Sequence, residues 1–111
     1  MKQIRPTELE HWLQRDADAA IEAAPLLLDV REPWEVDIVR LPGSVNIPMG
    51  EIPTRVVEID TSRPVVCICH HGVRSMHVAR FLADHGIDPI FNLAGGIDAW
   101  AREVNPDCPT Y

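Results

Sequence analysis

The sequence predicts an α/β domain in which a mostly parallel sheet of roughly five strands carries helices on both faces. Segments with strand character alternate with segments of helical periodicity, which is the order that strand–helix–strand units produce. Two strands, 25–30 and 65–68, are uninterrupted apolar runs, as expected for central parallel strands buried on both faces. Ten prolines lie mostly at the boundaries between these segments.

The first half of the chain begins with a short strand at 3–4. A helix follows in which Thr7 caps the N-terminus together with Glu10, and its apolar stripe comprises Leu9, Trp12 and Leu13. Segment 16–24 is compatible either with helix or with an irregular linker. After the strand at 25–30 we expect a short helix at 33–37, a turn at 41–44, a strand at 45–47 and a helix at 51–59.

The second half continues the alternation. After the strand at 65–68 we expect a helix at 75–85, a strand at 89–93, a tight turn at Gly95-Gly96 and a helix from Ile97. Residues 105–111, which include two prolines, are interpreted as a tail. We expect all the tryptophans in the core: Trp12, Trp34 and Trp100.

Composition limits the classes of protein that the chain can represent. With 111 residues, 46% of them hydrophobic, the chain fits one domain over 1–111. A net charge of −7 without any Lys/Arg run argues against nucleic acid or an anionic membrane as partner. Apolar runs are far shorter than the ~20 residues that span a bilayer, and the N-terminus lacks a signal-peptide pattern. We therefore expect a soluble, cytoplasmic protein.

The cysteine count argues for free thiols. Three cysteines leave at least one unpaired, as in a reducing compartment or at a reactive thiol. We interpret Cys67 and Cys69 as pointing to opposite faces of their strand, so that they could not bind one metal ion together. Structural zinc requires four ligands close to one another. We therefore expect neither a metal site nor a cofactor.

The most informative motif is residues 69–75, Cys-His-His-Gly-Val-Arg-Ser. Cys69 follows a buried strand and precedes a helix, where backbone N–H groups and the positive end of the helix dipole favour a thiolate. A thiolate is the reactive form of cysteine. Gly72 is expected to permit close backbone packing. Cys69 is therefore the candidate nucleophile.

The length of this loop favours one chemistry over another. Four residues separate Cys69 from Arg74, and a loop curled around the cysteine presents successive N–H groups as an anion nest. Cysteine phosphatases place five residues between these positions, so the present ring is tighter. One extra sulfur atom on Cys69 fits it better than a phosphoryl group. The loop therefore predicts sulfur transfer rather than phosphate hydrolysis.

The chain resembles a single-domain rhodanese, a family of sulfurtransferases. Four segments carry the resemblance in the family's order and spacing: 27–35 (LLDVREPWE), 41–48 (LPGSVNIP), 69–75 (CHHGVRS) and 92–100 (NLAGGIDAW). One departure is at Arg40-Leu41, where the family usually has His-Ile. The resemblance implies a three-layer α/β/α rhodanese-like fold.

It also implies a mechanism. Cys69 attacks the outer sulfur of an anionic donor, either thiosulfate or a protein persulfide, and carries a persulfide that cyanide or a thiol removes. The active loop that would hold the anion comprises His70, His71, Gly72, Val73, Arg74 and Ser75. Arg74 either orients the donor or braces the loop.

Three further residues are candidates for a supporting role. Asp29 ends a buried strand, where its carboxylate needs a partner, and either Arg31 or the loop after Gly43 supplies one. Arg31 could instead help to bind the donor, and Arg40 could alter contacts beside the loop. Cys108 is either an idle thiol or one that resolves the Cys69 persulfide.

Three alternatives remain open at this point. The chain could be a non-catalytic regulatory module, a sulfur carrier loaded by a cysteine desulfurase, or a cysteine phosphatase or arsenate reductase.

Overall fold

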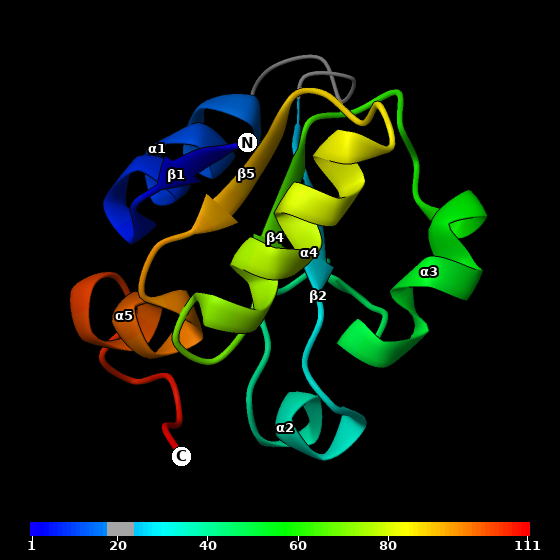
Figure 1. Cartoon of the computed structure of the whole chain (residues 1–111). Helices are drawn as coiled ribbons and strands as arrows, with labels where there is room; N and C mark the ends of the chain where they lie inside the picture. Colours follow the sequence, from blue (N-terminus) through cyan, green and yellow to red (C-terminus); the bar gives the residue numbers. More distant parts are fainter. Residues whose placement is uncertain (18–23) are drawn as a thin grey trace.

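The computed structural model describes residues 1–17 and 24–111, so most of the segment 16–24, interpreted as helix or linker, lies outside the described residues (Figure 1). A five-stranded sheet, parallel throughout, has the order β1-β5-β4-β2-β3. Its strands are β1 (Lys2–Ile4), β2 (Leu26–Asp29), β3 (Val45–Asn46), β4 (Val65–Ile68) and β5 (Ile90–Leu93). The predicted α/β class and strand number are confirmed.

Helices cover both faces of this sheet, which makes three layers (Figure 1). The α-helices are α1 (Pro6–Ala17), α2 (Pro33–Ile38), α3 (Ile52–Arg55), α4 (Val73–Asp84) and α5 (Gly96–Glu103). The core divides accordingly into two clusters. One contains Ile52, Val78 and Leu82 from the α3 and α4 side, and the other contains Leu9 and Trp100 from the α1 and α5 side.

The central strands are buried as their apolar sequences predict. Every residue of β2 and β4 is buried, and β4 lies between β2 and β5 with Leu28 opposite Cys67 and Cys67 opposite Asn92. In parallel sheets the carboxyl ends of the strands share one edge, where ligands bind. The ends of β2 and β4 therefore place Asp29 and Cys69 at the same edge.

The predicted helices of the first half differ from the structure in two places. The predicted Thr7–Glu10 cap is wrong: α1 begins at Pro6, and the Arg5 N–H donates to Glu8 Oε1 at 3.0 Å. Proline suits the first helical position because its missing N–H would have no partner there. The predicted helix at 51–59 is divided into 3₁₀ turns at Met49–Glu51 and Val56–Glu58 around the short α3.

The prediction that all three tryptophans lie in the core is wrong for one of them. Trp100 is buried and Trp12 is half-buried, but Trp34 in α2 is 61% exposed. Helix α2 lies beyond the carboxyl end of the sheet instead of on one of its faces (Figure 1), so it has less apolar surface to contact. Among the described residues, no helix is long and apolar enough to cross a membrane.

Candidate active site

The Cys69 thiol lies at the carboxyl end of β4, inside a tight turn that leads directly into α4. Its residue is 1% exposed, its Sγ accepts a hydrogen bond from the Gly72 N–H at 3.0 Å, and Ser75 Oγ lies 3.3 Å from Sγ. Helix α4 begins at Val73, two residues before the predicted start. Arg74 and Ser75 therefore belong to its first turn, and the loop proper is residues 69–72.

Glycines allow the backbone around the thiol to pack closely. Gly72 has φ +93°, and a Cβ there would lie 3.0 Å from the Gly95 nitrogen. A Cβ on Gly96 would lie 2.5 Å from the Cys69 carbonyl oxygen. That carbonyl accepts a hydrogen bond from the Ile97 N–H at 2.9 Å, so the first turn of α5 is bonded to the backbone of the active loop. The Gly95-Gly96 pair thus shapes the active loop as well as its own turn.

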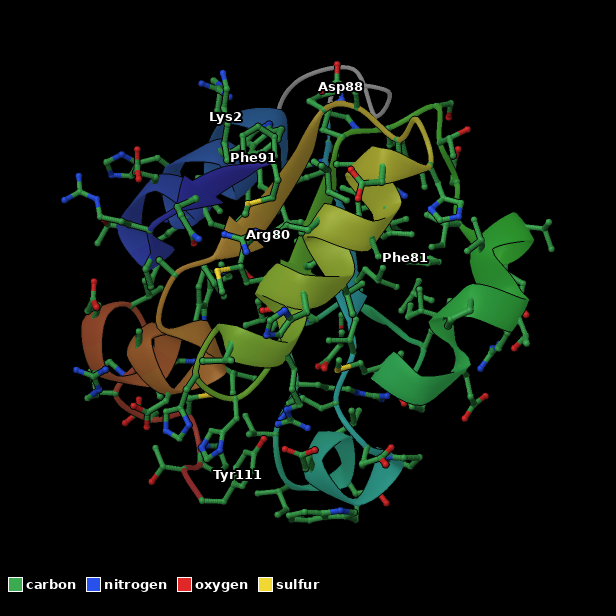
Figure 2. All side chains as sticks on the ribbon, viewed as in Figure 1. Lys2, Arg80, Phe81, Asp88, Phe91 and Tyr111 are labelled. Carbon is green, nitrogen blue, oxygen red and sulfur yellow. The ribbon has the colours of Figure 1, made fainter. Side chains whose placement is uncertain are left out.

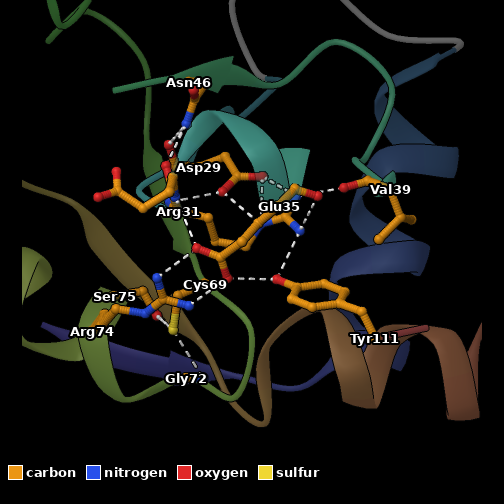
Figure 3. A network of polar contacts seen from close by, with 11 residues as sticks. Asp29, Arg31, Glu35, Val39, Asn46, Cys69, Gly72, Arg74, Ser75 and Tyr111 are labelled. Atoms are coloured by element: carbon orange, nitrogen blue, oxygen red, sulfur yellow. Dashed lines mark hydrogen bonds and ion pairs between the residues drawn. The ribbon is translucent and has the colours of Figure 1, made fainter. Parts of the chain in front are cut away.

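Arg74 is held by a buried carboxylate. Its two terminal nitrogens each donate to Glu35 at 2.8 Å, in a bidentate ion pair that joins α4 to α2 (Figure 3). Glu35 also accepts the Glu32 N–H at 2.9 Å. The Arg74 guanidinium lowers the pKa of Glu35 from 4.5 to about 2, and the same pairing raises the pKa of Arg74. Of the two predicted roles of Arg74, this geometry favours the brace.

Asp29 and Arg31 form a second ion pair, which is entirely buried. Nη2 of Arg31 lies 2.6 Å from the Asp29 carboxylate, and the side chains are 0% and 1% exposed. Arg31 also donates to the Val39 carbonyl at 2.6 Å and to the Glu35 carbonyl at 3.3 Å. Arg31 therefore supplies the partner that Asp29 needs. These bonds engage its guanidinium, which argues against a direct contact between Arg31 and a donor.

Tyr111 is a site residue that sequence reasoning missed. Its hydroxyl accepts from Arg31 Nη1 at 3.1 Å and donates to Glu35 Oε1 at 2.8 Å, and so links the two ion pairs (Figure 3). Figure 2 shows its side chain between α5 and α2. The ring stacks on His70 with centroids 3.9 Å apart. Segment 105–111, interpreted as a tail, therefore packs against the active loop, and no local pattern around Tyr111 indicates this.

The rings of His70 and His71 contact each other at an interplanar angle of 31°, with centroids 3.9 Å apart. Burial lowers the pKa of His70, and the neighbouring His71 lowers it further. Their nitrogens and a carboxylate oxygen of Asp98 lie within 4.8 Å of one another. The Asp98 carboxylate also pairs with Arg102 at 3.2 Å. The expectation that the chain has no metal site stays a prediction.

The other two cysteines differ from Cys69 in their surroundings. Cys67 and Cys69 share one core cluster, so the expectation that they face opposite sides was wrong; residues two apart in a strand point to the same face. Burial, with a contribution from Cys69, raises the pKa of Cys67 to about 12. Burial also raises the pKa of the half-buried Cys108. Both shifts disfavour the reactive thiolate.

Arg40 does not join the site in the structure. It is exposed, and no hydrogen bond or ion pair links it to any residue that the structure describes. Val73, the first residue of α4, is 58% exposed. Of the predicted loop residues, Gly72 and Ser75 form the contacts with the Cys69 sulfur that are described above.

Known proteins are similar to this chain in sequence and in architecture. The chain is 34% identical over 106 residues to the putative sulfurtransferase YtwF of Bacillus subtilis, covering 96% of both proteins. It is 34% identical to the rhodanese-like/PpiC domain-containing protein 12 of Arabidopsis thaliana, but spans only 38% of that protein's length. A rhodanese-related protein from Thermoplasma volcanium superimposes with a TM-score of 0.79 at 29% identity, with 96% of each chain covered.

The family comparison covers nearly the whole chain. Residues 6–103 match the Rhodanese-like domain, a range that includes all four segments on which the sequence resemblance rests. The five-stranded sheet and the loop after β4 agree with that match. This chain belongs to the family of rhodanese-like domains.

Proposed function

We propose that this chain is a sulfurtransferase that carries sulfane sulfur as a persulfide on Cys69. Relatives named sulfurtransferases support sulfur transfer as its general chemistry. The observation that carries the proposal is the position of Cys69 Sγ, 3.0 Å from the Gly72 N–H and next to the first turn of α4. Backbone N–H groups there stabilise negative charge on sulfur.

The reaction proceeds in two steps. In the first, the Cys69 thiolate attacks the outer sulfur of the donor; a new S–S bond forms, and the donor's own bond to that sulfur breaks. The donor's remaining group leaves with the electron pair, as sulfite from thiosulfate or as a thiolate from a persulfide. In the second, an acceptor thiolate or cyanide attacks the outer sulfur, and the Cys69 thiolate leaves.

The charges beside the loop favour a persulfide donor over thiosulfate. Arg74 is paired with Glu35 and Arg31 with Asp29, so each positive charge is offset by a carboxylate. A thiosulfate dianion therefore meets little net positive charge from these two arginines. A persulfide brings a single charge, which the loop N–H groups can stabilise on their own.

The unpaired cysteines and the absence of disulfides among them fit a reducing compartment, and we propose the cytoplasm. We also propose that 1–111 acts as one domain. The partners are then a small or protein-bound sulfur donor and a thiol acceptor.

Intact mass spectrometry tests the proposed function. Incubation with glutathione persulfide or thiosulfate should add one sulfur atom, about 32 Da, which cyanide removes as thiocyanate. Cys69→Ser should abolish the gain, whereas Cys108→Ser should retain it. Transfer by Cys69→Ser at the wild-type rate would overturn the proposal. No gain from either donor would indicate a non-catalytic module, and hydrolysis of a small aryl phosphate would indicate a phosphatase.

A further inference from the structure

The side-chain amide of Asn92 reaches the active loop from β5, and its orientation follows from its partners. Asn92 is 2% exposed, and its Nδ2 donates to the Gly72 carbonyl at 3.0 Å and to Gln3 Oε1 at 2.9 Å. A backbone carbonyl can only accept, so Nδ2 has to face Gly72. The amide oxygen of Asn92 therefore points the other way, toward Ser75.

Ser75 stands between this amide oxygen and the nucleophile. It is fully buried, and its hydroxyl donates to Oδ1 of Asn92 while Oγ lies 3.3 Å from Cys69 Sγ. A hydroxyl has one hydrogen and two lone pairs. With that hydrogen on Asn92, Ser75 presents a lone pair to Cys69. A thiol can donate its S–H to this lone pair, but a thiolate has nothing to donate.

We propose that Asn92 is a positioning residue that controls the protonation of Cys69 through the hydroxyl of Ser75. When Cys69 loses its proton, Sγ and Asn92 Oδ1 both require the same hydrogen. One of these two buried acceptors then loses that hydrogen bond, which is costly, and Sγ retains only the bond from the Gly72 N–H when Asn92 keeps the hydrogen. Asn92 thus favours the resting thiol over the bare thiolate. The inference rests on the proposed role of Cys69 as nucleophile.

The same arrangement favours the persulfide once it has formed. A persulfide carries its negative charge on the outer sulfur, so Sγ no longer requires the hydrogen of Ser75. The hydroxyl hydrogen of Ser75 can then stay on Asn92 Oδ1, so the hydrogen bond between Ser75 and Asn92 is kept. The network therefore opposes negative charge on Sγ but not on the transferred sulfur, which favours the first step of the reaction in the forward direction.

Other titratable groups also act on Cys69. Arg74 of α4 and Cys67 of β4 are electrostatically coupled to it, Glu35 of α2 pairs with Arg74, and His70 is its neighbour in the loop. A substitution at Asn92 replaces none of these four residues. The contribution of Asn92 can therefore be separated from theirs by measuring single variants and a double variant.

The test is the titration of the Cys69 thiol, followed by the ultraviolet absorbance of the thiolate as the difference from the same protein carrying Cys69→Ser. Asn92→Ala frees the Ser75 hydrogen for Sγ, so the titration midpoint should fall by about one unit, roughly tenfold more thiolate at neutral pH. The shift should be absent when Asn92→Ala is made in the Ser75→Ala background.

Asn46→Ala is the matched control, because Asn46 Nδ2 also donates to two carbonyls, those of Asp29 and Arg31, at 3.0 and 2.9 Å. It should leave the midpoint unchanged. An unchanged or raised midpoint in Asn92→Ala would overturn the proposal. An equal shift in the Ser75→Ala background would do the same, since it would show that Asn92 only braces the backbone at Gly72.

An infrared measurement needs no variant at Asn92. In the wild-type protein the S–H stretch of Cys69, identified by subtracting the Cys69→Ser spectrum, should show a hydrogen-bonded donor, and Ser75→Ala should return it to the unbonded frequency. A thiol that donates to nothing in the wild type contradicts the proposal. Because these readouts do not use sulfur transfer, their failure leaves the persulfide mechanism untouched, and failure of persulfide formation leaves them interpretable.

Discussion

Replacing Glu35 with glutamine measures how strongly the carboxylate beside the active loop stabilises the fold. The Glu35 side chain is 4% exposed and pairs with Arg74 through two hydrogen bonds of 2.8 Å. A third bond comes from the Tyr111 hydroxyl at 2.8 Å. Glutamine keeps the size of the side chain but removes the charge that both arginine nitrogens bind.

The pKa of Glu35 sets the magnitude. A shift from 4.5 to about 2 corresponds to about 3 kcal/mol of stability at neutral pH. Arg74 is 36% exposed, so water partly replaces the carboxylate as its partner in the variant. We therefore expect Glu35→Gln to lower the free energy of unfolding by about 2–3 kcal/mol. For 111 residues the entropy of unfolding is about 0.23 kcal/mol/K, so Tm should fall by roughly 9–13 °C.

The pH dependence provides the sign. Because the folded-state pKa of Glu35 lies below its unfolded value, its contribution is complete above 4.5 and is lost as the pH falls toward 2. The difference in Tm between wild type and Glu35→Gln, followed by circular dichroism, should therefore shrink from pH 6 to pH 3. This range of pH includes the unfolded-state pKa of Glu35, 4.5, and extends toward its folded-state pKa of about 2.

A matched control separates this effect from loss of a carboxylate in general. Glu58 also pairs with an arginine, Arg55 at 2.8 Å, but both side chains lie in solvent at 50% and 33% exposure. Glu58→Gln should change Tm little, because water and salt screen exposed pairs. An equal loss in both variants, or a Glu35→Gln loss that does not depend on pH, would refute the reasoning.

Two further predictions concern the packing of the loop. Gly96→Ala places a Cβ 2.5 Å from the Cys69 carbonyl oxygen, so it should lower Tm and should reduce the rate of sulfur loading at least tenfold. Gly86→Ala is the control: Gly86 has φ +84° and a Cβ there meets no atom within 4 Å, so this variant should lose stability but load sulfur normally. Similar loading rates in both variants would contradict this. Tyr111→Phe leaves the buried Arg31 without one acceptor and should destabilise the fold by about 1–2 kcal/mol in chemical denaturation, and an unchanged midpoint would show that the hydroxyl is dispensable.

The parts of the fold that sequence reasoning predicted correctly are those with local signals. The apolar runs of β2 and β4 need burial on both faces, so their position in the centre of a parallel sheet follows from composition alone. Errors occurred where the local signal was ambiguous. Thr7 and Glu10 have the spacing of a capping box, but the helix begins at Pro6, two positions before the start that this box predicts. Trp34 has an apolar ring, but α2 lies beyond the edge of the sheet and leaves that ring exposed.

The amino-acid sequence by itself determined the strand–helix order and the place of Cys69, because a strand end, a glycine and a helix start follow one another within a few residues. Tertiary structure alone decided what surrounds the thiol. Arg74 meets Glu35 across 39 positions, and Tyr111 meets Glu35 across 76. Parallel strands bring their ends together only when the sheet forms, so the partners of buried charges depend on contacts that no local spacing records.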